Sequence, residues 1–196
     1  MFSLQTIFGK GDRFFSLLEQ SAEAAHESTK ALTALLGHQG KSGSLAEFTR
    51  TRNREKELAA QISHELINTF VTAIEREDIE ALSAALYKIP KAVEKFAERY
   101  ALTTDRVGQV DFAPRAAMLE KAAGVVVRMV RELRRGMAIE TYKAMYDELQ
   151  AIVAEVRAKS AMIVDARPAV AGMKESYDSL MARAAAVRAK ALLYPF

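Results

Sequence analysis

The sequence contains no cysteine and no tryptophan, and only 9 of its 196 residues are glycine and 4 are proline. The absence of cysteine excludes a disulfide framework, a thiolate metal site and a cysteine nucleophile. Half of the residues are apolar, which is enough for a sizeable buried core. Because glycine and proline are scarce and the chain is rich in good helix formers, this composition predicts an all-α protein.

Long apolar runs are also missing. No stretch reaches the roughly 18 uninterrupted apolar residues that a membrane-spanning helix requires. The first residues, MFSLQTIFGKGDRFF, lack the basic region followed by an apolar core that is typical of a secretory signal. We therefore expect a cytoplasmic protein.

Charge of one sign is not in large excess, since the net charge is only +3. Binding to nucleic acid usually requires a concentrated basic stripe with aromatic residues between the cations, so no nucleic-acid partner is expected. The densest group of cations lies in RMVRELRR. Its arginines have two open interpretations: a solvated helix end whose cations complement the helix dipole, or docking to anionic lipid or an acidic partner. These arginines are Arg128, Arg131, Arg134 and Arg135.

The spacing of apolar residues predicts six long helices. Their expected starts are near Asp12, Ser44, Glu77 or Asp78, Pro114, Ile139 and Pro168. The segment TTDRVGQVDFA, residues 103–113, is the longest one without a helical period. We therefore expect two antiparallel three-helix bundles, formed by residues 1–102 and 114–196 and joined by residues 103–113.

The second predicted helix has an apolar stripe that includes Leu45, Ile62, Leu66 and Phe70. Its middle, TRTRNREKE, is polar and is expected to be solvated. In the third predicted helix the apolar residues recur from Ile79 onward, but their spacing does not continue the period of the second helix.

Four consecutive charged residues separate these two stripes: Glu75, Arg76, Glu77 and Asp78. Acidic side chains are favourable at a helix start, where they meet the helix dipole and the free amide donors. The four charges therefore predict a capped junction between two helices, in which Arg76 neutralises its acidic neighbours.

The segment around this junction, ISHELINTFVTAIEREDIEALSAAL (residues 62–86), resembles the PhoU-like family, in the branch found beside Pit-type phosphate transporters. The resemblance rests on His64-Glu65, on Asn68-Thr69-Phe70 and on the four junction charges. FFSLLEQSAEAA (residues 14–25) and KESYDSL (residues 174–180) also fit. The resemblance implies a non-enzymatic accessory or regulator of inorganic phosphate transport, which contacts a Pit-type membrane transporter at its cytoplasmic face and is peripheral at the inner membrane.

The resemblance also implies metal clusters held by acidic pairs four residues apart on neighbouring helices. Glu94 and Glu98 keep one such pair, but the matching region of the second helix has Ala60 and Gln61. The nearest carboxylates on that helix would complete a site only if the helix rotated; they are Glu55, Glu57 and Glu65.

In the second half, Arg183, Arg188 and Lys190 lie where carboxylates would be needed. Cations beside a site oppose metal binding. We therefore expect no cofactor, or a weakly held divalent or iron ion.

Two classes of function remain open. The first is the transport regulator just described. The alternative is a metal-free helical scaffold that binds a soluble protein or a second copy of itself. A carboxylate-bridged metalloenzyme is disfavoured, because the Glu-x-x-His unit of such bundles occurs only once, at Glu23 and His26.

Overall fold

The computed structural model describes residues 4–37, 45–72, 74–107, 110–135 and 138–166, with side chains between residues 12 and 158 of these ranges. These ranges contain five α-helices and no strand: α1 (Leu4–Gly37), α2 (Leu45–Asn68), α3 (Arg76–Val107), α4 (Ala113–Leu133) and α5 (Ile139–Ala166). The expected all-α class is therefore confirmed. The sixth expected helix, from Pro168, lies outside the described residues.

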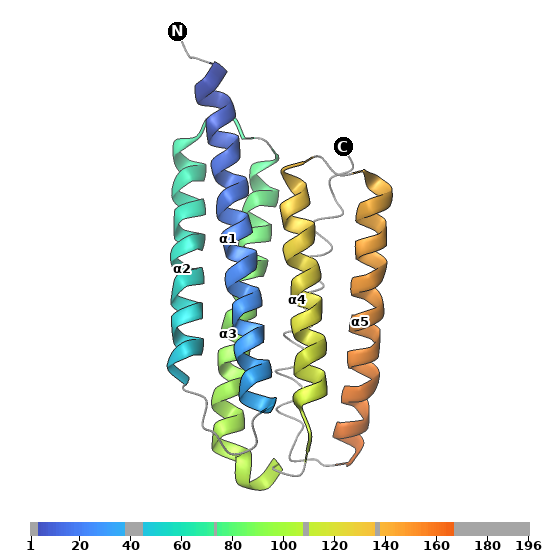
Figure 1. The fold of residues 1–196 in the computed structure, drawn as a ribbon. Helices are drawn as coiled ribbons and strands as arrows, with labels where there is room; N and C mark the ends of the chain where they lie inside the picture. The colour runs from blue at the N-terminus through green and yellow to red at the C-terminus, as the bar shows by residue number, and fades with distance from the viewer. Residues whose placement is uncertain (1–3, 38–44, 73, 108–109, 136–137, 167–196) are drawn as a thin grey trace.

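The helices are long, nearly parallel to one axis, and successive helices run in opposite directions (Figure 1). Helix α1 packs against α2, α3 and α4, and α4 also packs against α5. The N-terminal end of α1 extends beyond the other helices at the end of the bundle where α2 leads into α3 (Figure 1). None of the helices in the described ranges is both long and apolar enough to cross a bilayer.

The segment expected to connect two halves is partly helical. Helix α3 continues to Val107, and α4 begins at Ala113 with proline in its first turn, as expected for Pro114. Phe112 packs edge-on against Phe96 and Tyr100, with ring centroids 5.9 Å apart in both pairs. Because α1 contacts α4 as well as α2 and α3, the described helices form a bundle with an interface across the expected boundary.

The predicted apolar stripes of α2 and α3 form much of the core. Ile62, Leu66 and Ile79 are all buried. The prediction for Phe70 is wrong, because this side chain is 99% exposed. Helix α2 ends at Asn68, so Phe70 lies beyond the helix whose period placed it on the stripe. Leu45, at the first position of α2, is also exposed.

Two further expectations are corrected by the structure. The polar middle of α2 is not entirely solvated, because Thr51 and Glu55 are buried at positions that continue the core spacing of the helix. Asp12 does not start the first helix, because α1 already begins at Leu4. Instead, the Asp12 carboxylate forms an ion pair with Arg134, the residue that follows α4.

Candidate partner-binding site at the α2–α3 junction

Arg76 ties the start of α3 to the end of α2. Its guanidinium donates hydrogen bonds to the backbone carbonyls of Thr69, at 2.6 Å, and Leu66. Carbonyls at a helix C-terminus have no partner within the helix and carry the negative end of its dipole, so a cation is stabilising there. The role expected for Arg76 was neutralisation of neighbouring acids; the contacts found here add a cap for the preceding helix.

The start of α3 is hydrogen-bonded and acidic. The carbonyl of Glu75 accepts from the amides of Asp78 and Ile79, at 3.2 and 3.1 Å, and so closes the first turn. Glu77 and Asp78 lie in that turn, whereas Glu75 precedes it. Carboxylates at these positions face the positive end of the helix dipole.

The junction exposes three large apolar side chains within five residues: Ile67 is 80% exposed, Phe70 99% and Val71 56%. We call these three residues the apolar tip. Thr69 and Ile74 of the same junction are buried and anchor it to the bundle. A single exposed apolar residue is ordinary, but a group of them that includes an aromatic ring is typical of a contact surface for another protein.

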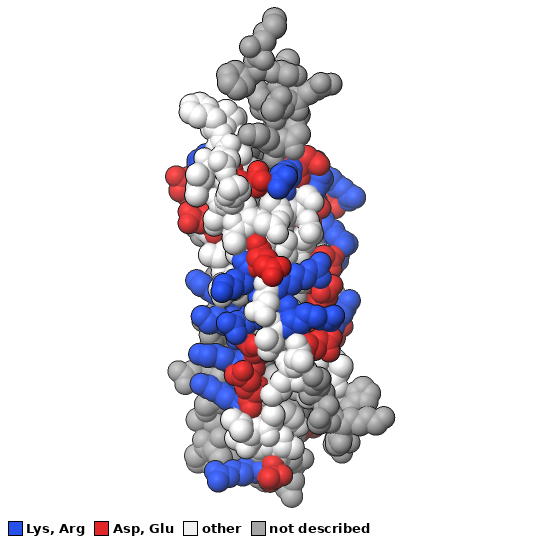
Figure 2. Space-filling view, turned by 90° about the vertical axis from the view of Figure 1, so that its left-hand side faces the viewer, with Lys and Arg blue, Asp and Glu red and all other residues white. Residues whose placement is uncertain are grey.

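Carboxylates lie beside the apolar tip, on its α3 side. Residues 65–80 contain five acidic residues and one cation, Arg76, whose guanidinium is directed toward the α2 carbonyls. Glu75, Glu77 and Glu80 are exposed. Seen from the α2 side, the junction forms an uncharged projection with acidic side chains beside it (Figure 2, upper left). A complementary partner would present an apolar pocket within a basic rim.

The acidic pair expected to bind metal has a different environment in the structure. Glu94 is buried; one of its carboxylate oxygens accepts a hydrogen bond from Arg52 at 2.9 Å and the other accepts one from Thr49 at 3.0 Å. Glu98, one turn further along α3, is exposed. Because both oxygens of Glu94 are already held by α2, this pair does not fit the cluster that the family resemblance implies.

The three carboxylates considered as supporting metal ligands lie in three different environments. Glu65 forms an ion pair with Arg13 of α1 at 2.9 Å, Glu57 is exposed, and Glu55 is completely buried. Within the residues whose side chains are described, no group of three or more histidine, aspartate or glutamate side chains is close enough to hold a metal ion.

Glu55 is a buried acid in the α1–α2 interface. The hydroxyl of Ser21 donates to its Oε1, while its Oε2 has no hydrogen-bond partner. Burial raises the pKa of Glu55 to about 8, and the opposing effects of the Ser21 hydrogen bond and the Arg54 charge are smaller. At neutral pH the side chain is therefore mainly a neutral carboxylic acid.

The four arginines considered for docking, at the C-terminal end of α4 and in the turn after it, form ion pairs within the protein. Arg128 pairs with Glu148 of α5 at 2.7 Å, and Arg135 with Glu132 at 2.8 Å. The other two cross to α1: Arg131 pairs with Glu23, and Arg134 pairs with Asp12 and Glu19. These contacts connect α4 to α1 and α5. The cations that were considered for docking are therefore already paired with carboxylates of the same chain.

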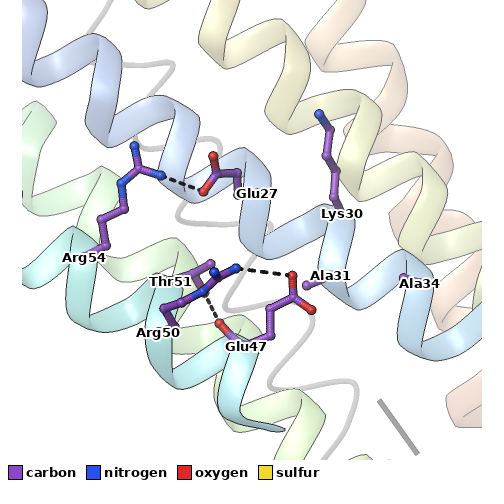
Figure 3. A pocket seen from close by; sticks show the side chains of 8 residues that line it. All are labelled: Glu27, Lys30, Ala31, Ala34, Glu47, Arg50, Thr51 and Arg54. Atoms are coloured by element: carbon purple, nitrogen blue, oxygen red, sulfur yellow. Dashed lines mark hydrogen bonds and ion pairs between the residues drawn. The ribbon is translucent and has the colours of Figure 1, made fainter. Parts of the chain in front are cut away.

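A groove of about 570 Å³ lies between the second half of α1 and the first half of α2 (Figure 3). Its charges are largely paired across or along the helices. Arg54 of α2 contacts Glu27 of α1 at 2.8 Å, and Arg50 lies 3.8 Å from Glu47. This pairing leaves the groove with little net charge toward a ligand.

Sequence reasoning missed the apolar tip, because it placed Phe70 inside a helix. The signal for an earlier helix end was Asn68, whose side-chain amide donates to the carbonyl of His64 at 2.8 Å and so competes with continued helix. Sequence reasoning also missed the burial of Glu55. That residue lies seven positions after Phe48 and seven before Ile62, which is the spacing of the core face.

Together these features define an all-α bundle with a group of exposed apolar side chains at one end. No protein-family model matches the chain, and no match was found among curated proteins.

Proposed function

We propose that this protein is a non-enzymatic regulator of inorganic phosphate transport, which acts by contact with a Pit-type transporter at its cytoplasmic face, where it is peripheral at the inner membrane. The pair of three-helix bundles, with a sixth helix after residue 168, is part of this proposal. Its starting point is the resemblance of residues 62–86 to the PhoU-like family.

One observation carries the proposal: the segment with the family resemblance is also the one that exposes the apolar tip. Phe70 is almost fully exposed, while the residues on both sides of it, Leu66 and Ile74, are buried. The ring is thus presented to solvent from an anchored turn. An aromatic side chain in this position is well suited to fill a pocket of a partner, since aromatic anchors contribute most of the binding energy of many interfaces.

The charge around the tip supports a membrane protein as the partner. Cytoplasmic loops of membrane proteins carry an excess of lysine and arginine. Such loops would complement Glu75, Glu77 and Glu80, which lie exposed on the α3 side of the tip. A rim of this kind mainly accelerates association and selects the partner, while the buried apolar contact holds it.

The test is phosphate uptake by cells that lack this protein and are complemented with variants. Deletion should change the rate of uptake, and the wild-type protein should restore it. Phe70→Asp should fail to restore it, because a carboxylate in an apolar pocket is strongly unfavourable. Ile139→Asp is the matched control: Ile139 is also exposed, at 63%, but lies at the start of α5.

Uptake that is unchanged on deletion, at high and low phosphate, would refute the transport role and leave the scaffold alternative. Equal failure of Phe70→Asp and Ile139→Asp would refute the assignment of the contact surface to the apolar tip. Circular dichroism of both purified variants verifies that they are folded.

A further inference from the structure

The outer face of α3 carries a line of cations. Lys88, Lys91, Lys95, Arg99 and Arg106 are all exposed, and we call them the basic stripe. Their spacings of 3, 4, 4 and 7 residues keep them on one face of the helix. The core residues of the same helix lie on the opposite face, so the stripe points to solvent over a length of about 27 Å.

The basic stripe differs from the arginines of α4 in its electrostatic partners. Within the residues whose side chains are described, Lys91, Lys95 and Arg106 form no ion pair, whereas each of the four arginines at the end of α4 considered above (Arg128, Arg131, Arg134 and Arg135) forms at least one. Glu98 and Asp105 border the stripe, so cations outnumber acids on this face. Figure 2 shows lysine and arginine side chains crowded along the middle of this side of the bundle, on the left where α3 lies.

An exposed leucine lies within the basic stripe. Leu102 is 86% exposed and is located one turn after Arg99 and one turn before Arg106. Exposure of a leucine between two cations has no benefit for folding. A bulky apolar side chain among basic residues is the combination by which peripheral proteins bind membranes, because the apolar group enters the interface while the cations attract anionic headgroups.

We propose that the basic stripe and Leu102 form a surface on which the protein binds an anionic lipid bilayer. This inference specifies how the protein would be held at the membrane in the proposed function. It rests on the proposed function in one respect: that function places the protein close to a membrane. Lysine ammonium groups on flexible stems suit a fluid layer of headgroups, since they require no fixed partner geometry. The stripe has no aromatic residue between its cations, which disfavours a single-stranded nucleic acid.

The first experiment is flotation of the purified full-length protein with lipid vesicles. The protein should float with vesicles of phosphatidylcholine mixed with phosphatidylglycerol, and not with phosphatidylcholine alone. Binding should weaken steeply as salt is added, because the attraction is screened within a Debye length. Equal binding to both kinds of vesicle would overturn the proposal.

The second experiment compares two triple variants with the same change of net charge. Lys91→Gln/Lys95→Gln/Arg106→Gln should weaken binding to the anionic vesicles on the order of a hundredfold, at roughly fivefold for each cation. The control removes three exposed cations of α4 and α5 and should bind almost like the wild type. The control substitutions are Lys121→Gln, Lys143→Gln and Arg157→Gln. An equal loss in both variants would show attraction by net charge alone and would overturn the assignment to α3.

Leu102→Ser tests the apolar part of the surface. It should weaken binding about tenfold, and the loss should persist at high salt because it is not electrostatic. If the basic stripe binds an acidic polypeptide or nucleic acid and the protein does not bind vesicles, the lipid proposal is overturned, and that molecule is the partner of the stripe. Thermal melting verifies that each variant is folded.

Failure of this inference is distinguishable from failure of the proposed function. Vesicle binding is measured without a transporter, and Phe70→Asp should leave it unchanged while abolishing the restoration of phosphate uptake. A protein that binds anionic vesicles but does not affect uptake retains this inference and loses the proposed function. A protein that affects uptake but binds no vesicles retains the proposed function and loses this inference.

Discussion

The hydroxyl of Ser21 on α1 donates a hydrogen bond to the carboxyl group of Glu55 on α2, in a part of the core that water does not reach. This pair joins the two helices, but it satisfies only one of the two carboxyl oxygens of Glu55. A charged carboxylate in this position would be poorly compensated, so the fold favours the protonated acid.

This burial predicts that stability falls as the pH rises. The pKa of Glu55 is about 8 in the folded chain and 4.5 in a solvated one, because burial disfavours the ionised form. The contribution of Glu55 to the stability of the fold is therefore complete below about pH 4.5 and is lost progressively as the pH rises to about 8. The total loss is several kcal/mol, roughly 5. Urea denaturation of the wild type and Glu55→Gln between pH 5 and 9 measures this difference.

The variant Glu55→Gln should have a flatter dependence of the unfolding free energy on pH, because glutamine does not ionise. Glu57→Gln is the matched control on the same helix, since Glu57 is exposed. It should follow the wild type. The same slope for wild type and Glu55→Gln would mean that the Glu55 side chain is solvated in solution.

Replacement of Arg76 should destabilise the junction between α2 and α3. Arg76→Ala removes the hydrogen bonds to the carbonyls of Leu66 and Thr69. We expect a loss of about 1–2 kcal/mol in the free energy of unfolding, since a hydrogen bond from a charged donor contributes in this range. Chemical denaturation measures the loss. Lys95→Ala, at an exposed cation in the interior of α3 without such a bond, should have almost no effect.

The helices of this protein were predictable, but their ends and the buried acid were less so. The stripe from Ile79 to Phe96 follows from apolar spacing alone, because burial on one face requires that period. The exposure of Phe70 depends on where α2 ends. There the Asn68 side chain bonds the His64 carbonyl within α2, and Arg76 bonds carbonyls across the turn. The partners of the α4 arginines depend on which helix lies beside α4, and only the tertiary structure fixes this.

The candidate site was predictable in part. The four junction charges are recognisable from their sequence: Glu75 lies between the two helices, and the other three begin α3. The exposure of Phe70 beside them was not recognised, because an aromatic residue at helical spacing is usually buried. Glu55 was interpreted as a surface carboxylate for the same general reason: acids are rarely buried, and residue type outweighed position.

Gly124 of α4 offers a site for stabilisation. A methyl group added there would lie 3.7 Å from the imidazole of His26 on α1, which is ordinary van der Waals contact. Gly124→Ala should therefore stabilise the protein by about 1 kcal/mol, because glycine in a helix is unfavourable relative to alanine. The measurement is the midpoint of thermal unfolding. Gly124→Leu should lower the midpoint instead, since its larger side chain has to displace His26. A lower midpoint for Gly124→Ala would indicate that α1 and α4 are closer than in this structure.

The last prediction concerns Glu94, which is expected to act in packing and not as a metal ligand. Its two carboxylate oxygens are held by Arg52 and Thr49 from α2, and the side chain is only 6% exposed. A divalent cation at Glu94 would have to displace the Arg52 guanidinium, and Glu98 alone would add a single exposed carboxylate.

Purified protein should therefore contain iron or another divalent metal at a substoichiometric level or not at all. Glu94→Gln should lower the midpoint of thermal unfolding, because it removes the charge that compensates Arg52 in a partly buried pair. Glu98→Gln should leave the midpoint unchanged, and neither variant should change the metal content determined by elemental analysis. A full equivalent of tightly bound metal that is lost in both variants would contradict this, and it would require that Arg52 leave Glu94 when the metal binds.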